Sequence, residues 1–268
     1  MKTLINMEFY KFFKNKFFIV SFLIIPILSV VVSRRVIESL VTSANMVNYG
    51  SLPYLALDNK VYLLLWILII YYNVSSITEE MSSGELRITL AKGVEKHKLI
   101  IAKVIVLLIV LAIYLFMYGI CVYIYGLLSL GGESYILVHS TGEKVVGISA
   151  IIYTIKFYFL SYSIAVSFMS IITFISVLSK NTLIASGCSM GFFLINIVIP
   201  DILFRIIKNE KVLEILKHTS LYSIQYFLKV FLNNAKLDIA YTLMSLLLYI
   251  VIFYSISFYT IKKENYLN

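Results

Sequence analysis

A serine between two glycines is the residue of this chain that most resembles a reactive centre. Segment 187–191 reads Gly-Cys-Ser-Met-Gly, and the G-x-S-x-G pattern presents a nucleophilic serine in many hydrolases. A serine nucleophile needs a base within hydrogen-bond reach. The three histidines, His97, His139 and His218, all lie outside the long apolar segments, so the sequence does not favour a serine hydrolase within the membrane.

The same five residues also read as G-x-x-x-G. Gly187 and Gly191 stand four residues apart and share one face of a helix, which lets a second helix approach closely. We therefore predict helix packing at this point, either within the chain or across a dimer axis.

Phosphate and metal chemistry lack their usual residues. None of the eleven glycines precedes a lysine, whereas a Walker A loop needs Gly-Lys followed by Ser or Thr. No two histidines stand three or four residues apart, so we expect no metal site and no cofactor bound by this chain. The apolar segments also contain no Asp or Glu, the residues on which ion-coupled transporters depend within the membrane.

Composition indicates the class of protein. Hydrophobic residues make up 60% of the 268 residues and charged residues only 14%, with a mean hydropathy of +0.92. These values predict an all-α integral membrane protein, with residues 1–268 forming a single transmembrane domain. The net charge of +9 is explained by lysines at an anionic membrane surface, and we expect no nucleic-acid partner.

Windows of about twenty apolar residues predict six membrane spans. They are Phe17 to Ile37, Val61 to Thr78, Leu99 to Leu128, Ile148 to Leu178, Thr182 to Ile199 and Ile239 to Ile261. Twelve of the 23 lysines and arginines fall in segments assigned to the inside. These segments are short and their charges lie close to the span ends, so we expect both termini in the cytoplasm of a plasma-membrane protein.

Amphipathic segments flank the spans. Ile5, Phe9, Phe12 and Phe13 share one side of a helical wheel, which predicts a helix in the inner membrane interface. After Pro200, the possible N-caps Asp201, Asn209 and Ser220 predict two or three short amphipathic helices at the outer interface. The segments around Gly50 and Pro53 and around Gly131 and Gly132 read as ordinary connections.

The charged segment from Glu79 to Lys98 lies between two apolar runs. Leu86, Leu90 and Val94 recur there at four-residue spacing among charged residues. This spacing predicts a short helix with one apolar face, suited to docking on another protein.

A longer pattern runs through this segment into the next span. It reads Glu80-x-x-x-Gly84-Glu85-Leu86, then Leu90, Gly93-Val94 and Ala102-Lys103. This pattern resembles the one that follows the second span in permease subunits of type-2 ATP-binding-cassette (ABC) exporters, where an acidic residue precedes Gly-Thr-Leu, a leucine, Pro-Val and Gly-Lys. Glu85, Gly93 and Ala102 depart from the family pattern. The six spans, the N-terminal helix and the outer helices also match, so the resemblance covers essentially the whole chain.

The resemblance implies a coupling helix that rests in a groove of a separate ATP-binding subunit. The residues expected at this contact are Glu80, Gly84, Leu86, Arg87, Leu90 and Lys92. It also implies two copies of that subunit, which bind ATP and Mg, and a second permease copy, identical or different. The chain itself would then not be an enzyme.

Tyrosines indicate where a substrate would pass. Tyr114, Tyr118 and Tyr125 form a stripe on one face of the third predicted span. A wall with apolar rings and hydroxyl groups suits an amphipathic substrate, although aromatic belts at the membrane interfaces also explain such residues. Small permeases of this family often export antimicrobial or cytolytic peptides, and the resemblance implies such a peptide, or a drug-like or lipid-like molecule, as substrate.

Our expectation is therefore a dimeric six-span permease driven by a partner ATPase. Two alternatives from other classes stay open. One is a rhomboid-like intramembrane serine protease that uses Ser189. The other is a membrane anchor or sensor that recruits a cytosolic protein without transport.

Overall fold

The structure is a computed structural model that describes residues 1–41, 48–57, 59–85, 89–90, 93–130, 135–137, 144–179, 181–233 and 236–263. Several residues to which the sequence analysis gave a role lie outside the described residues, namely Leu86, Arg87, Lys92 and His139.

Within the part of the chain that the structure describes, six helices are long and apolar enough to cross a membrane. Each overlaps one predicted span, so the prediction of six such helices is confirmed. They are α2 (Lys16–Val41), α4 (Asn59–Asn73) with its continuation, α7 (Lys96–Ser129), α8 (Ile148–Leu178), α9 (Thr182–Ile206) and α12 (Lys236–Lys263). The continuation of α4 consists of a π-helical turn, η1 (Val74–Glu79), and one turn of α-helix, α5 (Glu80–Ser82).

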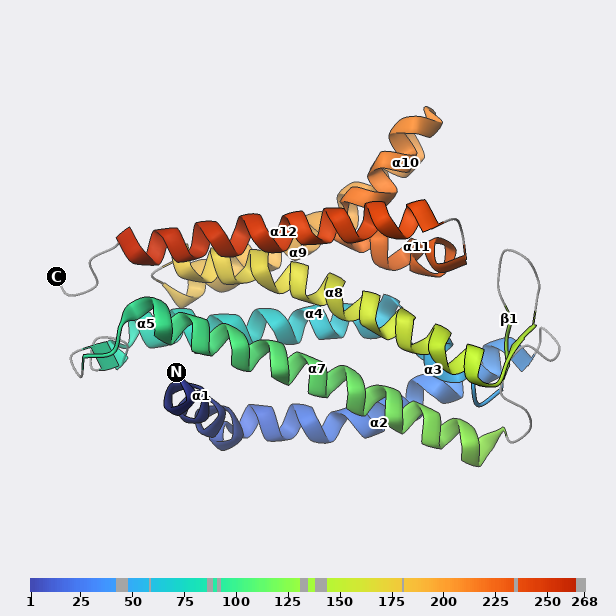
Figure 1. Ribbon diagram of the computed structural model, residues 1–268, viewed down its shortest axis with the longest axis horizontal. Coiled ribbons are helices and arrows are strands. Elements are labelled where there is room, and N and C mark those ends of the chain that lie inside the picture. The colour runs from blue at the N-terminus through green and yellow to red at the C-terminus, as the bar shows by residue number, and fades with distance from the viewer. Residues whose placement is uncertain are drawn as a thin grey trace.

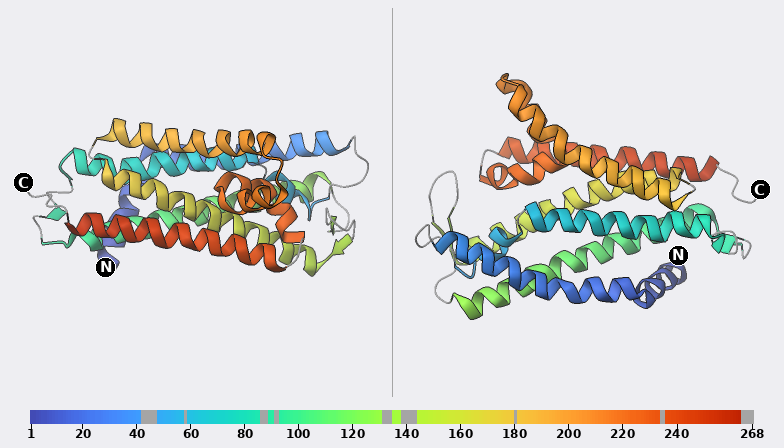
Figure 2. Two further views of the ribbon diagram at one scale, coloured as in Figure 1. Left: turned by 90° about the horizontal axis from the view of Figure 1, so that it is seen from above. Right: turned by 180° about the vertical axis from the view of Figure 1, so that it is seen from behind.

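The long helices run side by side along the longest axis of the molecule (Figure 1). Helix α1 (Lys2–Lys14), α5, the start of α7 and the end of α12 lie at one end, called here the α1 end (Figure 2). The opposite end, called the hairpin end, carries α3 (Leu52–Ala56), α11 (Leu221–Asn233) and a pair of strands. Strand β1 (Tyr135–Leu137) pairs antiparallel with β2 (Lys144–Val146), Tyr135 opposite Val146.

The core lies among α4, α7 and α8. Within the protein, 78% of the apolar window of α8 is buried, against 17% for α9 and 11% for α12. Trp66 of α4 stacks on Phe168 of α8, with ring centroids 4.3 Å apart and planes 7° from parallel. Helices α9 and α12 therefore expose most of their apolar surface to lipid or to another subunit.

The segment around Pro53, expected to be an ordinary connection, is instead the buried helix α3. Proline is favoured in the first turn of a helix, and Pro53 occupies that position. Tyr118 OH donates to the Ala56 carbonyl (2.8 Å) and Tyr158 OH to the Pro53 carbonyl (3.1 Å). The expectation was wrong because tertiary hydrogen bonds from two other helices satisfy this backbone.

The helices predicted after Pro200 are present as α10 (Glu210–Thr219) and α11. Asn209 caps α10 by accepting from the Lys211 amide at 3.1 Å. Leu221, Ile224 and Leu228 of α11 are fully buried, whereas Tyr226 is 58% exposed, so α11 packs one face against the bundle and leaves the opposite face exposed. Helix α10 projects away from the long helices (Figure 2).

Candidate functional site: a charged cluster and an apolar groove

Four charged side chains meet at the α1 end. Lys103 of α7 places its Nζ 2.9 Å from Glu8 Oε2 and 2.7 Å from Glu80 Oε2. Lys11 of α1 completes the cluster with its Nζ 2.8 Å from Glu80 Oε1. The cluster joins α1, α5 and α7, which are distant in sequence.

The centre of the cluster is inaccessible to water. The Lys103 side chain is 0% exposed and Glu8 is 2% exposed, whereas Lys11 is 38% exposed. Removal of one partner from a buried ion pair costs about 3–5 kcal/mol because the other charge stays buried. Burial alone would lower the pKa of Lys11, but its hydrogen bond to Glu80 and the nearby carboxylates raise that pKa above the ordinary value. Lys11 therefore stays charged at neutral pH.

The second predicted span ended at Thr78, whereas the apolar helix in the structure continues to Ser82. The expectation that the spans hold no acidic residue is corrected accordingly, since Glu79 and Glu80 belong to this continuation. The other long apolar helices also contain acidic residues near their ends, namely Glu38 in α2, Asp201 in α9 and Asp238 in α12. The π-helical turn η1 precedes Glu80 directly, and π turns occur frequently at functional sites. Glu80 is tolerated at this end of the helix because Lys11 and Lys103 neutralise it.

The predicted coupling segment is described at residues 79–85, 89–90 and 93–98. Gly84 and Gly93 have φ angles of +80° and +82°, a region that glycine adopts without steric cost. Thr89 Oγ1 donates to the Glu85 carbonyl at 3.1 Å, and Leu90 and Val94 pack against the core. Glu80, Gly84 and Leu90 of the expected contact set thus lie at the α1 end, and Leu86, Arg87 and Lys92 are outside the described residues.

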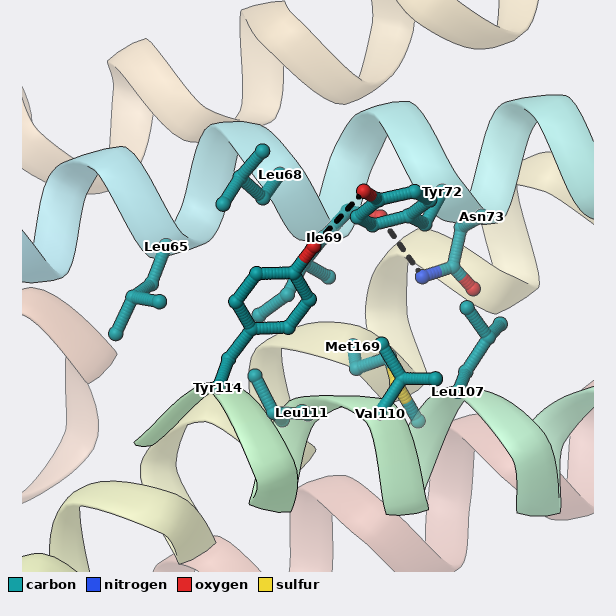
Figure 3. Close-up of a pocket in the computed structure, with 10 residues that line it drawn as sticks. All are labelled: Leu65, Leu68, Ile69, Tyr72, Asn73, Leu107, Val110, Leu111, Tyr114 and Met169. Atoms are coloured by element: carbon teal, nitrogen blue, oxygen red, sulfur yellow. Dashed lines mark hydrogen bonds between the residues drawn. The ribbon is translucent and has the colours of Figure 1, made fainter. Parts of the chain in front are cut away.

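Hydroxyl groups from three helices meet near the middle of the bundle. Tyr72 OH and Tyr114 OH lie 3.0 Å apart, and they point toward each other between α4 and α7 (Figure 3). Ser21 of α2 hydrogen-bonds both, with its Oγ 2.6 Å from Tyr72 OH. Nearby, Asn73 Oδ1 accepts a 2.7 Å hydrogen bond from Thr173 of α8. The three hydroxyl groups connect α2, α4 and α7, and the contact of Asn73 with Thr173 separately connects α4 with α8.

An apolar groove of about 200 Å³ lies beside these hydroxyl groups, between α2 and α4. Tyr114 and Tyr118 of α7 line it together with exposed side chains such as Ile24 and Leu64. Tyr125 is half-buried and does not line this groove. The structure therefore brings two of the three predicted tyrosines to one groove, and their hydroxyl groups bond within the protein.

Gly187 and Gly191 lie on an open face of α9. A Cβ atom added at either position would meet nothing within 4 Å, and the neighbouring Cys188 is exposed. Packing of this face against another helix of the same chain, one of the two predictions made, does not occur among the described residues. The face is free to contact a second subunit.

Ser189 is fully buried, and its Oγ has no hydrogen-bond partner in the described part of the chain. His218 Nδ1 lies 3.1 Å from Thr242 Oγ1, and His97 pairs with Glu95 at 3.1 Å. Ser189 thus has no base within reach among these residues. Over the same residues, no group of three or more His, Cys, Asp and Glu side chains is placed to hold a metal ion.

Several members of these sites are not predicted by the sequence pattern. Glu8 was not singled out, although an acidic residue inside an apolar-faced helix is a recognisable signal of a buried partner. Lys103 was noted only within the resemblance, and Ser21, Tyr72 and Thr173 were not considered. These residues are distant in sequence and meet only through tertiary packing, so their contacts are not predicted by local residue spacing.

The fold defines a multi-pass helical membrane protein. The chain belongs to the family designated DUF2705, described as "Protein of unknown function", whose profile matches residues 38–267. No curated protein matches the chain. The matched region includes Glu80 and Lys103 and begins after α1, which carries Glu8 and Lys11.

Proposed function

We propose that this chain is the membrane-spanning subunit of an ATP-driven exporter of the type-2 ABC class. It moves an amphipathic substrate out of the cell, with antimicrobial or cytolytic peptides as the favoured class. The observation that carries the proposal is the buried cluster of Glu8, Glu80 and Lys103, which attaches the charged segment between α5 and α7 to three helices at once.

This attachment is what a coupling segment requires. Glu80 stands at the start of the segment and Lys103 in the helix that follows it, and they pair at 2.7 Å. A displacement of the segment by a partner protein therefore acts on the ends of α4 and α7 together. Those two helices carry Tyr72 and Tyr114, whose hydroxyl groups belong to the network, and Tyr114 also lines the groove.

The proposal also gives the chain an orientation, a second permease copy and a substrate path. The α1 end faces the cytoplasm, where two ATP-binding subunits bind and hydrolyse ATP with Mg. The open glycine face of α9 contacts a second permease copy. The groove lined by Tyr114 and Tyr118 forms part of the substrate path, because its apolar wall suits the apolar face of an amphipathic substrate.

Co-purification with the ATP-binding subunit tests the proposal. Changing Leu86 and Leu90 to Asp removes the predicted apolar ridge and should abolish the complex while membrane insertion continues. Because Leu90 also packs against the core of this chain, Leu86→Asp alone separates loss of the contact from loss of folding. Val212 and Ile215, exposed on α10 far from this segment, provide the matched control when they are changed to Asp, and this control should keep the complex.

An unchanged complex in the Leu86 and Leu90 variant contradicts the assignment of the coupling segment. A complex that depends on these leucines but shows no nucleotide-dependent movement of the helices favours the anchor or sensor alternative.

A further inference from the structure

A hollow of about 610 Å³ lies between α7 and α8, in the half of the bundle nearest the hairpin end. Its lining is mainly apolar, and Phe116, Ile155 and Phe159 are each more than 60% exposed there. Its volume lies within the range of about 300–1,000 Å³ that is typical of ligand sites. Because these three lining residues are exposed, the hollow opens on the outer side of the helix bundle.

Packing of two residues determines the shape of this hollow. A Cβ atom on Gly119 of α7 would lie 3.1 Å from the Tyr158 ring of α8. The absence of that atom lets the ring approach α7, and Tyr158 OH donates to the Pro53 carbonyl at 3.1 Å. The floor of the hollow is thus held by a specific contact between three segments.

A cation lies on the border of the hollow. Lys156 is exposed on α8, between the lining residue Ile155 and, one turn further, Phe159. No carboxylate pairs with Lys156 within the described residues. A lysine inside a membrane span is unfavourable unless its long side chain reaches the headgroup region or finds an anion.

We propose that this hollow binds an acyl chain of an anionic phospholipid, with Lys156 contacting the phosphate of that lipid. Along α8 the lining runs from Ile151 to Tyr162, a rise of about 17 Å at 1.5 Å per residue. One leaflet of hydrocarbon is about 15 Å thick, so one acyl chain matches the hollow in length. The lipid belongs to the leaflet at the hairpin end. The proposal does not depend on ATP-driven export, because Tyr114 and Tyr118 take no part in this site.

Native mass spectrometry of the purified full chain tests the proposal. The protein is incubated with equal amounts of phosphatidylglycerol and phosphatidylcholine that carry the same acyl chains. Phosphatidylglycerol should be retained preferentially, and Lys156→Gln should weaken its binding roughly five-fold, as expected for one cation beside an anionic headgroup. Ala112→Phe, which fills the inner part of the hollow, should reduce binding of both lipids.

Two controls match these variants. Lys262→Gln removes an exposed cation at the α1 end, and Val251→Phe adds a ring to an exposed face of α12; neither should alter lipid retention. Equal retention of the two lipids overturns the assignment to an anionic lipid. Retention unaffected by Ala112→Phe overturns the hollow as the binding site. Cross-links between two chains through Ile120→Cys, with no lipid retained, assign the hollow to a second copy and also overturn the proposal.

Discussion

Lys103 Nζ lies 2.7 Å from Glu80 Oε2, and this contact joins the start of the charged segment to α7, the helix in which the segment ends. Lys103 also pairs with Glu8 at 2.9 Å, which brings the N-terminal helix to the same point. The ends of α1, α5 and α7 are therefore held together by one buried lysine.

The first prediction concerns this lysine. Lys103→Met leaves Glu8 and Glu80 buried with only Lys11 beside them, so the free energy of unfolding should fall by about 3–5 kcal/mol. Denaturant titration in micelles measures this loss. Combining Lys103→Met with Glu80→Gln should cost less than the sum of the two single changes, because the pair is coupled.

An exposed ion pair supplies the control for the changes at Lys103. Arg34 and Glu38 of α2 pair at 2.8 Å, but their side chains are 74% and 61% exposed. Arg34→Met should change stability by less than about 1 kcal/mol. Equal losses for Lys103→Met and Arg34→Met would contradict the role given to the buried cluster.

The second prediction separates two glycines by their backbone conformation. Gly84 has a φ of +80° and open space around it, so Gly84→Ala should destabilise the turn by about 1–2 kcal/mol through backbone strain alone. Gly187 lies in helix α9 with nothing within 4 Å. Gly187→Ala should stabilise that helix by about 0.5–1 kcal/mol. Thermal unfolding of both variants checks the opposite signs, and the same sign for both would count against the described turn.

The third prediction concerns assembly. Gly187→Leu with Gly191→Leu should weaken the dimer by about 1–3 kcal/mol through overpacking between subunits. The monomer should stay folded because no atom of the same chain lies within 4 Å of either added Cβ. Sedimentation of the purified permease and cross-linking through the exposed Cys188 measure the dimer.

Gly119→Leu is the contrasting change for this test, because its side chain would collide with Tyr158 at 3.1 Å within the same chain. It should destabilise the monomer itself. An unchanged dimer in the Gly187 and Gly191 double variant would show that the G-x-x-x-G spacing has no role in dimer formation.

The positions of the spans could be predicted because long apolar runs are a local property of the sequence. Their ends could not, since the continuation of α4 through Glu80 depends on Lys103 and on Lys11. Likewise the spacing of the tyrosines on α7 could be predicted from the sequence. The burial of Tyr114 could not, because it depends on a hydrogen bond to Ser21 of another helix. Helix α3 was missed because five residues around a proline have no periodicity, and only tertiary hydrogen bonds reveal them.

The fourth prediction concerns pH at the hairpin end. His218 stacks on Phe231 with ring centroids 4.4 Å apart, and burial lowers its pKa below the ordinary value, with Lys217 adding to the effect and Asp238 and Glu214 opposing it. As the pH falls, the unfolded chain therefore takes up a proton on His218 at a higher pH than the folded chain does. Stability should be constant above about pH 6.5 and should fall as the pH drops below that value.

Unfolding temperatures between pH 7.5 and pH 5 measure this effect. His218→Gln should flatten the dependence. His97→Gln, at the exposed pair with Glu95 near the α1 end, should leave it in place. A dependence that is identical in the wild type and in His218→Gln would contradict the assignment to His218.

The most direct test of the proposed function is transport by the permease reconstituted in proteoliposomes with its ATP-binding subunit. An amphipathic cationic or zwitterionic helical peptide should stimulate ATP hydrolysis and move across the membrane, whereas a small hydrophilic sugar should not. Because ATP is the proposed energy source, collapse of the proton or sodium gradient should have no effect. Leu64→Trp, which narrows the groove beside Tyr114 and Tyr118, should lower peptide stimulation. Movement that requires an ion gradient and no ATP, or stimulation by the sugar alone, would contradict the account.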